Sequence, residues 1–383
     1  MDTTDYAHAG PGSPMGRILR QYWQPVAMTE ELDQRQALPV RILHEDLTIY
    51  KGESGQYYVV DFRCAHRGTQ LSTGWVEGEC IRCFYHGWKY DGSGQCVEMP
   101  AEDPSFPPKV KIKSYPTRVY AGLVFAYMGE GVPPPMWHCQ ELERDHGVKW
   151  TERNPWPCNW FQRVENAIDG SHLAFVHSGS AFGQRVTAEI PQFEVEETAW
   201  GMRMTSHRSP GNVRINEFHF PNVLHIRAPV LRDGVGQTPW PDLWNWYLPV
   251  DDTHSVLLTA RCAPLVGEDA RRFAELLPPI QYYNPADEHA FLLANPREAD
   301  NAVDPVAAQD YVAQMGQGPI ADRGSERLGQ GDAGIVFARG LLRREMARLE
   351  RGLPLKQWQR KSPGPPLPLP PGVPDAPDLL AAR

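Results

Sequence analysis

The chain has 383 residues, 41% of them hydrophobic, and its 38 Lys and Arg against 47 Asp and Glu give a net charge of −9. This length favours two domains, and the composition is that of a globular protein with a core. An acidic chain without a long basic run argues against nucleic-acid binding. No signal peptide and no membrane-spanning apolar run is visible, so we expect a cytoplasmic protein that does not bind membranes.

The first part of the chain predicts short strands. A Gly/Pro-rich entry leads into a short helical pattern, SPMGRILRQYWQPVAM, at residues 13–28. From Pro39 to Met128, β-branched and aromatic runs alternate with Gly-containing turns, as in hairpins. The Pro-rich stretch GEGVPPPMW cannot continue a sheet or a helix, so we place a domain boundary within about residues 130–150. The predicted domains are residues 1–145 and 146–355.

The second part mixes element types. Residues 159–177 have helical character, and the segments 218–230 and 244–264 are typical of strands. Ile335, Leu341, Leu342, Met346 and Leu349 recur at helical spacing near the end. The remaining tail, residues 356–383, is Pro-rich and is expected to be extended.

Two pairs of possible metal ligands stand in the strand-rich part. They are Cys64 with His66, and Cys83 with His86, each on a turn between short strands. Mixed thiolate and imidazole ligands suit either tetrahedral zinc or an iron–sulfur cluster with two Cys on one iron and two His on the other. The spacing alone leaves both open, together with a structural role. Seven cysteines without a secretion signal argue only against a disulfide framework.

The surrounding sequence favours the cluster. Residues 64–102, CAHRGTQLSTGWVEGECIRCFYHGWKYDGSGQCVEMPAE, resemble a Rieske domain almost throughout. By that resemblance Cys64, His66, Cys83 and His86 hold a [2Fe–2S] cluster, whereas Cys80 and Cys96 do not.

A second group of ligands follows in NAIDGSHLAFVH. Asp169, His172 and His177 have a spacing used for non-haem Fe(II), and two imidazoles with one carboxylate leave positions open for O₂ and substrate. The two histidines would point about 140° apart on an ideal helix, so we predict an irregularity at residues 173–176. Taken alone, the histidines could be structural and Asp169 a turn or cap residue.

Both groups together resemble the oxygenase subunits of Rieske non-haem iron oxygenases, in the phthalate-dioxygenase-like branch, over residues 12–345. The resemblance implies an α+β fold: an N-terminal all-β Rieske domain, then a helix-grip catalytic domain with an antiparallel sheet. It implies that His172 and His177 bind a mononuclear Fe(II), that Asn166 lines the site, and that Asp169 links it to the cluster of a neighbouring subunit. Asp332 matches the third ligand, although Asp before a helical pattern is also a favoured N-cap.

The implied activity needs a partner. Fe(II) alone cannot supply all the electrons for O₂ reduction, and neither a G-x-G-x-x-G after a strand nor a second four-Cys cluster is present. We therefore expect an NAD(P)H-dependent flavin/iron–sulfur reductase as partner. The resemblance also implies a homotrimer or a multiple of it.

The expected reaction is hydroxylation or dihydroxylation of a small aromatic substrate, an aromatic carboxylate by the resemblance. An O-demethylase of a methoxylated aromatic is the alternative within the family. A Rieske electron carrier and a zinc-stabilised binding protein are alternatives of other classes. A carboxylate would favour an arginine fork, for which the candidates are Arg203, Arg208, Arg214 and Arg227.

Overall fold

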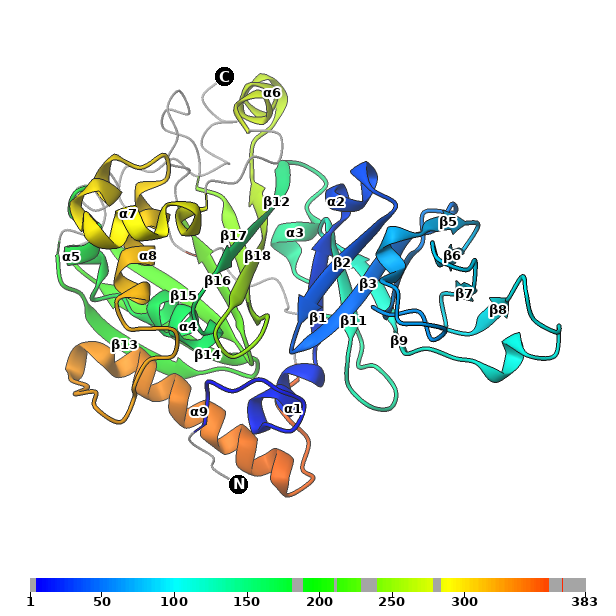
Figure 1. The fold of residues 1–383 in the computed structure, drawn as a ribbon. Helices are drawn as coiled ribbons and strands as arrows, with labels where there is room; N and C mark the ends of the chain where they lie inside the picture. Colours follow the sequence, from blue (N-terminus) through cyan, green and yellow to red (C-terminus); the bar gives the residue numbers. More distant parts are fainter. Residues whose placement is uncertain are drawn as a thin grey trace. The chain divides into compact units, whose positions relative to one another are not determined.

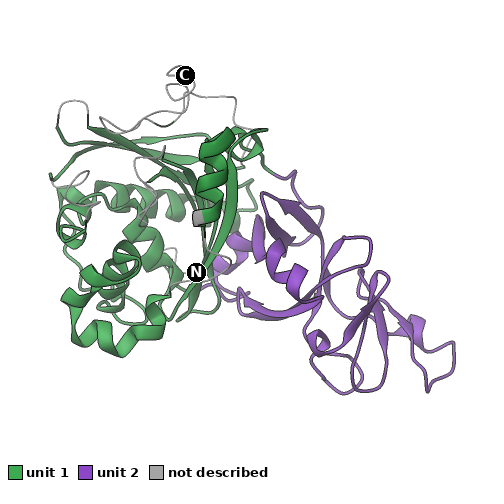
Figure 2. Ribbon diagram, turned by 90° about the horizontal axis from the view of Figure 1, so that it is seen from above, with its two compact units in different colours: residues 1–8, 137–383 green, residues 9–136 purple. Residues whose placement is uncertain are grey.

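The computed structural model describes residues 5–180, 189–209, 212–228, 240–277, 284–357 and 367. The chain divides into two compact units, coloured separately in Figure 2. One unit spans residues 9–136, and the other contains residues 5–8 together with the described residues from 137 onward. The change of unit lies in the Pro-rich stretch, but assigning the first residues to the first domain was wrong. Most of the Pro-rich tail, predicted for residues 356–383, lies outside the described residues.

The unit of residues 9–136 is built from three small antiparallel sheets. Their strand orders are β1–β11–β10, β2–β3–β4–β9 and β5–β6–β7–β8. The strands are β1 (Trp23–Met28), β2 (Ala37–Ile42), β3 (Glu45–Lys51), β4 (Tyr57–Asp61), β5 (Trp75–Glu77), β6 (Cys80–Arg82), β7 (Lys89–Asp91), β8 (Cys96–Glu98), β9 (Ser114–Tyr115), β10 (Thr117–Tyr120) and β11 (Leu123–Tyr127). All five residues of β11 are buried, as a continuous apolar run predicts.

Two short helices accompany these strands. Helix α1 (Pro14–Arg20) begins where the Ser13 hydroxyl accepts a hydrogen bond from the Gly16 N–H at 3.0 Å, with proline at the first helical position. The helical pattern expected over residues 13–28 ends earlier, because its second half forms β1 and pairs with β11. Helix α2 (Thr29–Gln34) follows directly.

The second unit is organised around one antiparallel sheet of seven strands, visible in Figure 1. Its order is β12–β18–β17–β16–β15–β14–β13. The strands are β12 (Val148–Trp156), β13 (Gln192–Glu197), β14 (Gly201–His207), β15 (Val213–His219), β16 (Val223–Arg227), β17 (Asp242–Pro249) and β18 (Ser255–Ala263). Every residue of β17 is buried, so this strand is covered on both faces.

Alternate residues of β17 serve the two faces of the sheet. Trp244 and Trp246 point to one face, where Trp137 stacks on them with ring centroids 5.1 and 5.4 Å away. Asn245 and Tyr247 point to the opposite face, because side chains alternate along a strand, and there they line a cavity.

The helices of the second unit are α3 (Gln140–Glu143), α4 (Trp160–Ile168), α5 (Leu173–Val176), α6 (Gly267–Leu276), α7 (His289–Ala294), α8 (Pro305–Met315) and α9 (Ala333–Glu350). Helix α4 packs against β16, β17, α8 and α9. Helix α9, orange in Figure 1, buries Leu341, Leu342 and Met346, as the helical spacing predicted. Within the described part of the chain, no helix combines the length and the apolar character that crossing a membrane requires.

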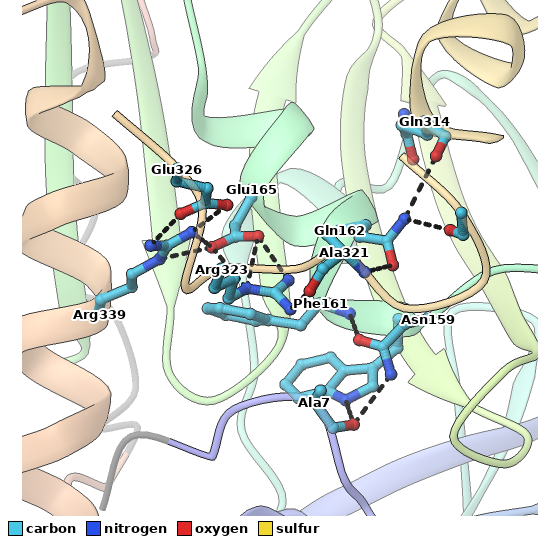
Figure 3. A network of polar contacts seen from close by, with 12 residues as sticks. Ala7, Asn159, Phe161, Gln162, Glu165, Gln314, Ala321, Arg323, Glu326 and Arg339 are labelled. Carbon is cyan, nitrogen blue, oxygen red and sulfur yellow. Dashed lines mark hydrogen bonds and ion pairs between the residues drawn. The ribbon is translucent and has the colours of Figure 1, made fainter. Parts of the chain in front are cut away.

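A polar network holds α4 in place, as Figure 3 shows. The Glu165 carboxylate accepts hydrogen bonds at 2.6 Å from both Arg323 and Arg339, and Arg339 also pairs with Glu326 at 2.7 Å. One turn earlier in α4, the Gln162 side chain accepts a hydrogen bond from the Ala321 N–H at 2.8 Å. The chain after α8 is thereby tied to the helix that leads into Asp169.

Replacing Glu165 by Ala should destabilise the protein strongly. The side chains of Glu165, Arg323 and Arg339 are 10%, 15% and 12% exposed, so the change leaves two largely buried guanidinium groups without their shared carboxylate. We expect a loss of about 3–5 kcal/mol in the free energy of unfolding, measured by denaturant titration. The control is Glu268→Ala, whose Arg271 pair is 58% and 74% exposed. An equal loss in both variants would contradict this role for Glu165.

Candidate metal centres and cavity

The first candidate centre lies on two loops of the same construction. The Cys64 N–H donates to the Thr69 carbonyl at 2.9 Å, and the Gly68 N–H donates to the Cys64 carbonyl at 2.9 Å. The loop from Cys83 to Gly87 repeats both bonds one hairpin later. Gly68 and Gly87 have φ values of +74° and +73°, which L-residues with side chains rarely adopt. Both cysteines therefore begin a tight turn that brings a histidine back beside them.

These loops bring the four predicted residues together. Cys64 and Cys83 are 3% and 2% exposed and belong to the core of the unit as free thiols. The rings of His66 and His86 lie edge to face with centroids 4.4 Å apart, and His86 is exposed. Two buried thiols and two imidazoles are the ligand types that would hold a [2Fe–2S] cluster with two cysteine and two histidine ligands.

Tyr90 contacts one of the buried sulfurs. Its hydroxyl oxygen accepts the Ala65 N–H at 3.2 Å and lies 3.3 Å from Cys64 Sγ. Because the oxygen is the acceptor toward Ala65, its own hydrogen can point to the sulfur. Hydrogen bonds to cluster sulfurs are one of the features that set a reduction potential. Cys80 and Cys96, which were expected not to be ligands, lie on β6 and β8.

The second candidate centre begins where α4 ends. Asp169 is the C-cap of α4, with an extended backbone, and α5 is a single turn between His172 and His177. The irregularity predicted for residues 173–176 therefore lies earlier, and Asp169 and His172 do not share a helix. The two imidazoles flank the single turn α5, with ring centroids 5.4 Å apart.

A carboxylate from α8 completes this group. Asp310 Oδ1 lies 3.5 Å from His172 Nε2 and 3.3 Å from His177 Nε2. In contrast, the Asp332 carboxylate accepts a hydrogen bond from the Gly329 N–H at 2.6 Å, at the start of α9. The structure therefore brings Asp310, and not the predicted Asp332, to the two histidines; Asp332 stands at the N-cap position of α9 but makes no side-chain capping bond to that helix.

Sequence reasoning missed Asp310, although its segment carries a signal. In PVAAQDYVAQM, the sequence of α8, Asp310 is the single charged residue. A lone carboxylate in an otherwise uncharged helix is unusual because burying a charge is costly without a cation or a partner. The segment contains no histidine or cysteine, so the spacing of these residue types gives no indication of a ligand there.

Neighbouring side chains orient both imidazoles. Gln309 Oε1 lies 2.8 Å from His177 Nδ1, so Nδ1 donates and the lone pair of Nε2 faces Asp310. The Gln309 amide in turn donates to Asp300 Oδ1 at 2.6 Å. On the other ring, His172 Nδ1 lies 3.6 Å from Asp169 Oδ2.

The charges of the site are strongly coupled. Burial disfavours the charged form of His172, but Asp169 and Asp310 outweigh burial and raise its pKa to about 9. Burial likewise acts to raise the pKa of Asp310, but His172 and His177 hold it well below its usual range. Without a metal, the group keeps a proton on His172, and a divalent cation that binds there must displace it. Two imidazoles and one carboxylate fit a non-haem iron.

A cavity of about 310 Å³ opens beside this second centre. Asn166 and Asp169 are among its lining residues, together with His172, His177 and Asp310. Its walls combine apolar and aromatic side chains with a few polar ones, as sites for small organic molecules do. Its other lining residues include Trp150, Trp156, Arg163, Arg214, Asn216, Leu224, Ile226, Leu243, Asn245, Tyr247, Leu257, Thr259 and Arg261.

The four arginines considered for a substrate carboxylate differ in their partners and in whether they line the cavity. Arg203 pairs with Glu217 at 2.9 Å and with Glu196 at 3.0 Å. Arg208 donates to the Gly170 carbonyl at 3.2 Å, and Arg227 donates to the Leu367 carbonyl at 2.8 Å. Of the four, Arg214 lines the cavity.

Comparison with known proteins gives two family matches along the chain. Residues 22–116 match the Rieske [2Fe-2S] domain, and residues 156–259 match the vanillate O-demethylase oxygenase C-terminal domain. The two matches lie in the two units, and each contains the candidate ligands of one centre except Asp310.

Two relatives are similar over most of the chain. The chain is 31% identical over 358 residues to the 5,5'-dehydrodivanillate O-demethylase oxygenase subunit of Sphingobium sp. (strain NBRC 103272 / SYK-6), covering 90% of this chain and 80% of the relative. It is 31% identical over 376 residues to the phthalate 4,5-dioxygenase oxygenase subunit of Pseudomonas putida, covering 89% and 84%.

A solved structure shares the fold. It is the caffeine complex of the NdmA QL mutant from Pseudomonas putida CBB5, with a TM-score of 0.66, 23% identity, and coverage of 87% of this chain and 92% of that chain. The predicted α+β fold, an all-β Rieske domain followed by a catalytic domain with an antiparallel sheet, is confirmed. The chain therefore belongs to the Rieske non-haem iron oxygenases, as the oxygenase subunit with a Rieske [2Fe–2S] cluster and a mononuclear iron.

Proposed function

We propose that this oxygenase acts on a small aromatic carboxylate, which it holds in the cavity through Arg214. In this assignment Cys64, His66, Cys83 and His86 bind the cluster, which passes electrons singly. His172, His177 and Asp310 bind the iron, which supplies the activation of O₂. The burial of Arg214 in the cavity wall carries the substrate assignment.

The surroundings of Arg214 favour an anion. Its side chain lies over the Trp240 ring, 5.4 Å from the centroid, and donates to the Arg227 carbonyl at 3.1 Å. Burial, together with the charge of Arg208, lowers its pKa to about 9. A substrate carboxylate beside the guanidinium would offset this cost through a charge-assisted hydrogen bond.

Two other arginines line the cavity. Arg261 pairs with Glu152 at 2.6 Å, and Arg163 donates to the Asn154 carbonyl at 2.9 Å and lies over Trp156 at 4.0 Å. Their polar groups therefore shape the wall. The side chains of Leu224, Leu243 and Leu257 supply an apolar surface for a ring.

O-demethylation of a methoxylated aromatic is the second candidate reaction. It is favoured by the match to the vanillate O-demethylase C-terminal domain and by the relative that acts as a 5,5'-dehydrodivanillate O-demethylase. Arg214 would serve a carboxylate equally in hydroxylation and in demethylation. Product analysis distinguishes the two, because demethylation releases the methyl carbon and hydroxylation retains every carbon.

Electrons must come from outside this chain. We infer an NAD(P)H-dependent reductase as partner and a trimeric assembly or a multiple of it. Asp169 contacts His172 and accepts the Ser171 N–H at 2.7 Å. We propose that it positions this candidate iron ligand and couples the iron to the cluster of a neighbouring subunit.

A substrate screen tests the function. The purified chain with a reductase and NAD(P)H is given benzoates, phthalates and methoxybenzoates, and O₂ uptake is compared with product identity by mass spectrometry. We expect coupled uptake with at least one aromatic carboxylate. Uptake with neutral aromatics alone would contradict the assigned substrate class.

The cluster ligands can be tested against a nearby cysteine. Cys83→Ser should abolish the visible and EPR signals of the Rieske cluster, because a thiolate ligand is lost. Cys80→Ser, three residues earlier on β6, should retain both signals. Loss of the signals in the Cys80 variant, or their survival in the Cys83 variant, would refute the assignment.

The corrected iron ligand can be tested against the earlier prediction. Asp310→Asn should lower the iron content from about three to about two per chain, since the cluster keeps its two irons. Asp332→Asn should keep all three and weaken only the hydrogen bond from the Gly329 N–H. Iron analysis together with the cluster EPR signal provides the measurement. The reverse result would restore Asp332 as the ligand.

The role of Arg214 can be tested with matched substrates. Arg214→Met should raise KM for an accepted carboxylate by roughly ten- to hundredfold, because a hydrogen bond to a charged group is lost. The amide of the same acid should show little change between the wild type and the variant. An equal effect on acid and amide would indicate a packing defect.

A further inference from the structure

A second group of metal-ligand atoms lies on the face of the sheet opposite the cavity. Glu217 and His219 stand two residues apart on β15, and His225 lies directly across from Glu217 on β16. Asn216 and Leu224, their neighbours in sequence, line the cavity. Because side chains alternate along strands, the Glu217, His219 and His225 group points away from the substrate and from the mononuclear iron.

The geometry of this group resembles that of the iron ligands. Glu217 Oε2 lies 3.7 Å from His219 Nε2 and 3.6 Å from His225 Nδ1, and the three ligand atoms lie within 4.8 Å of one another. At the iron site the corresponding distances are 3.5 and 3.3 Å. Such separations are too long for direct hydrogen bonds but suit atoms that share an ion.

The outer nitrogen of His225 is held by a carboxylate. His225 Nε2 lies 3.1 Å from Asp242 Oδ1, and Arg144 holds the other Asp242 oxygen at 3.0 Å. If Nε2 donates to Asp242, the lone pair of Nδ1 points toward Glu217. A lone pair facing a carboxylate is repulsive unless a cation lies between them. A metal-binding histidine whose second nitrogen donates to a carboxylate is a recurrent arrangement.

Two further side chains, Arg203 and Glu141, contribute to the electrostatics of this group. Arg203 donates to Glu217 Oε1 at 2.9 Å, so the carboxylate is oriented with Oε2 toward the histidines. Glu141, on α3, has an Oε2 atom that is buried and has no hydrogen-bond partner among the described residues. Its negative charge acts on His225. The side chains of Glu217, His219 and His225 are 0%, 5% and 1% exposed, so the site is closed to solvent.

We propose that Glu217, His219 and His225 bind a structural Zn²⁺ ion. Imidazole and carboxylate ligands in a closed site suit zinc, whereas a catalytic metal keeps an open position. The ion would join β15 to β16 and, through Asp242, to β17, behind the wall that carries Arg214. The competing arrangement is a proton on His225 shared between Asp242 and Glu217, and it predicts no metal.

Metal analysis of the intact holoprotein tests the proposal. Protein produced with added zinc and iron should contain about one Zn²⁺ per chain beyond its irons. His219→Asn and His225→Gln should lose this zinc. The control His207→Gln, a half-buried histidine on β14 of the same sheet, should retain it. Zinc below a tenth of an equivalent in the wild type would overturn the proposal and support the protonated pair.

Two measurements exclude zinc bound at the iron-containing sites. His172→Ala should retain the zinc, and its loss there would place the ion at the iron centre instead. X-ray absorption at the zinc edge should show nitrogen and oxygen ligands, and sulfur ligands would place the zinc on Cys64 and Cys83. Because neither readout depends on turnover, failure of the zinc site and failure of the proposed substrate are separable.

Discussion

The buried contact between the Asp310 carboxylate and two imidazoles joins two segments that are far apart in the sequence. It brings α8 to the turn around α5, and Gln309 and Asp300 extend the contact outward. Helix α4 is fixed independently through Glu165. Both ends of the segment from α4 to His177 are therefore held by buried contacts, and strands of the sheet supply much of the remaining cavity lining.

Sequence spacing predicted the members of each candidate centre that lie close together in the sequence, and it missed the member that lies far away. Cys64, His66, Cys83 and His86 occupy two similar turns one hairpin apart, and glycines at positive φ mark both turns. His172 and His177 lie five residues apart and were found in the same way. The carboxylate beside these histidines, Asp310, comes from a distant helix, and its position depends on how α8 packs against α4 and α5. Local spacing holds no information on that packing.

The error at Asp332 has a physical cause. An aspartate before a helix is favoured as a cap, so its presence there needs no metal. Asp310, in contrast, lies in the interior of an otherwise uncharged helix, where its carboxylate can neither cap the helix nor pair with a charged residue of the same helix. The strands were predicted well where apolar runs are long, as in β11 and β17. The sequence did not predict that residues 5–8 belong to the second unit. They join it through long-range contacts such as the hydrogen bond from the Trp160 ring N–H to the Ala7 carbonyl.

The alternation of β15 and β16 also limits how this protein can change in evolution. Cavity residues and the histidine–glutamate group occupy neighbouring positions on the same two strands. Insertion or deletion of one residue within either strand would exchange the faces of all residues beyond it, so both sets would be lost at once. Substitutions can therefore tune the substrate wall one position at a time. Changes of length are confined to the connections between strands, where divergence among related oxygenases should concentrate.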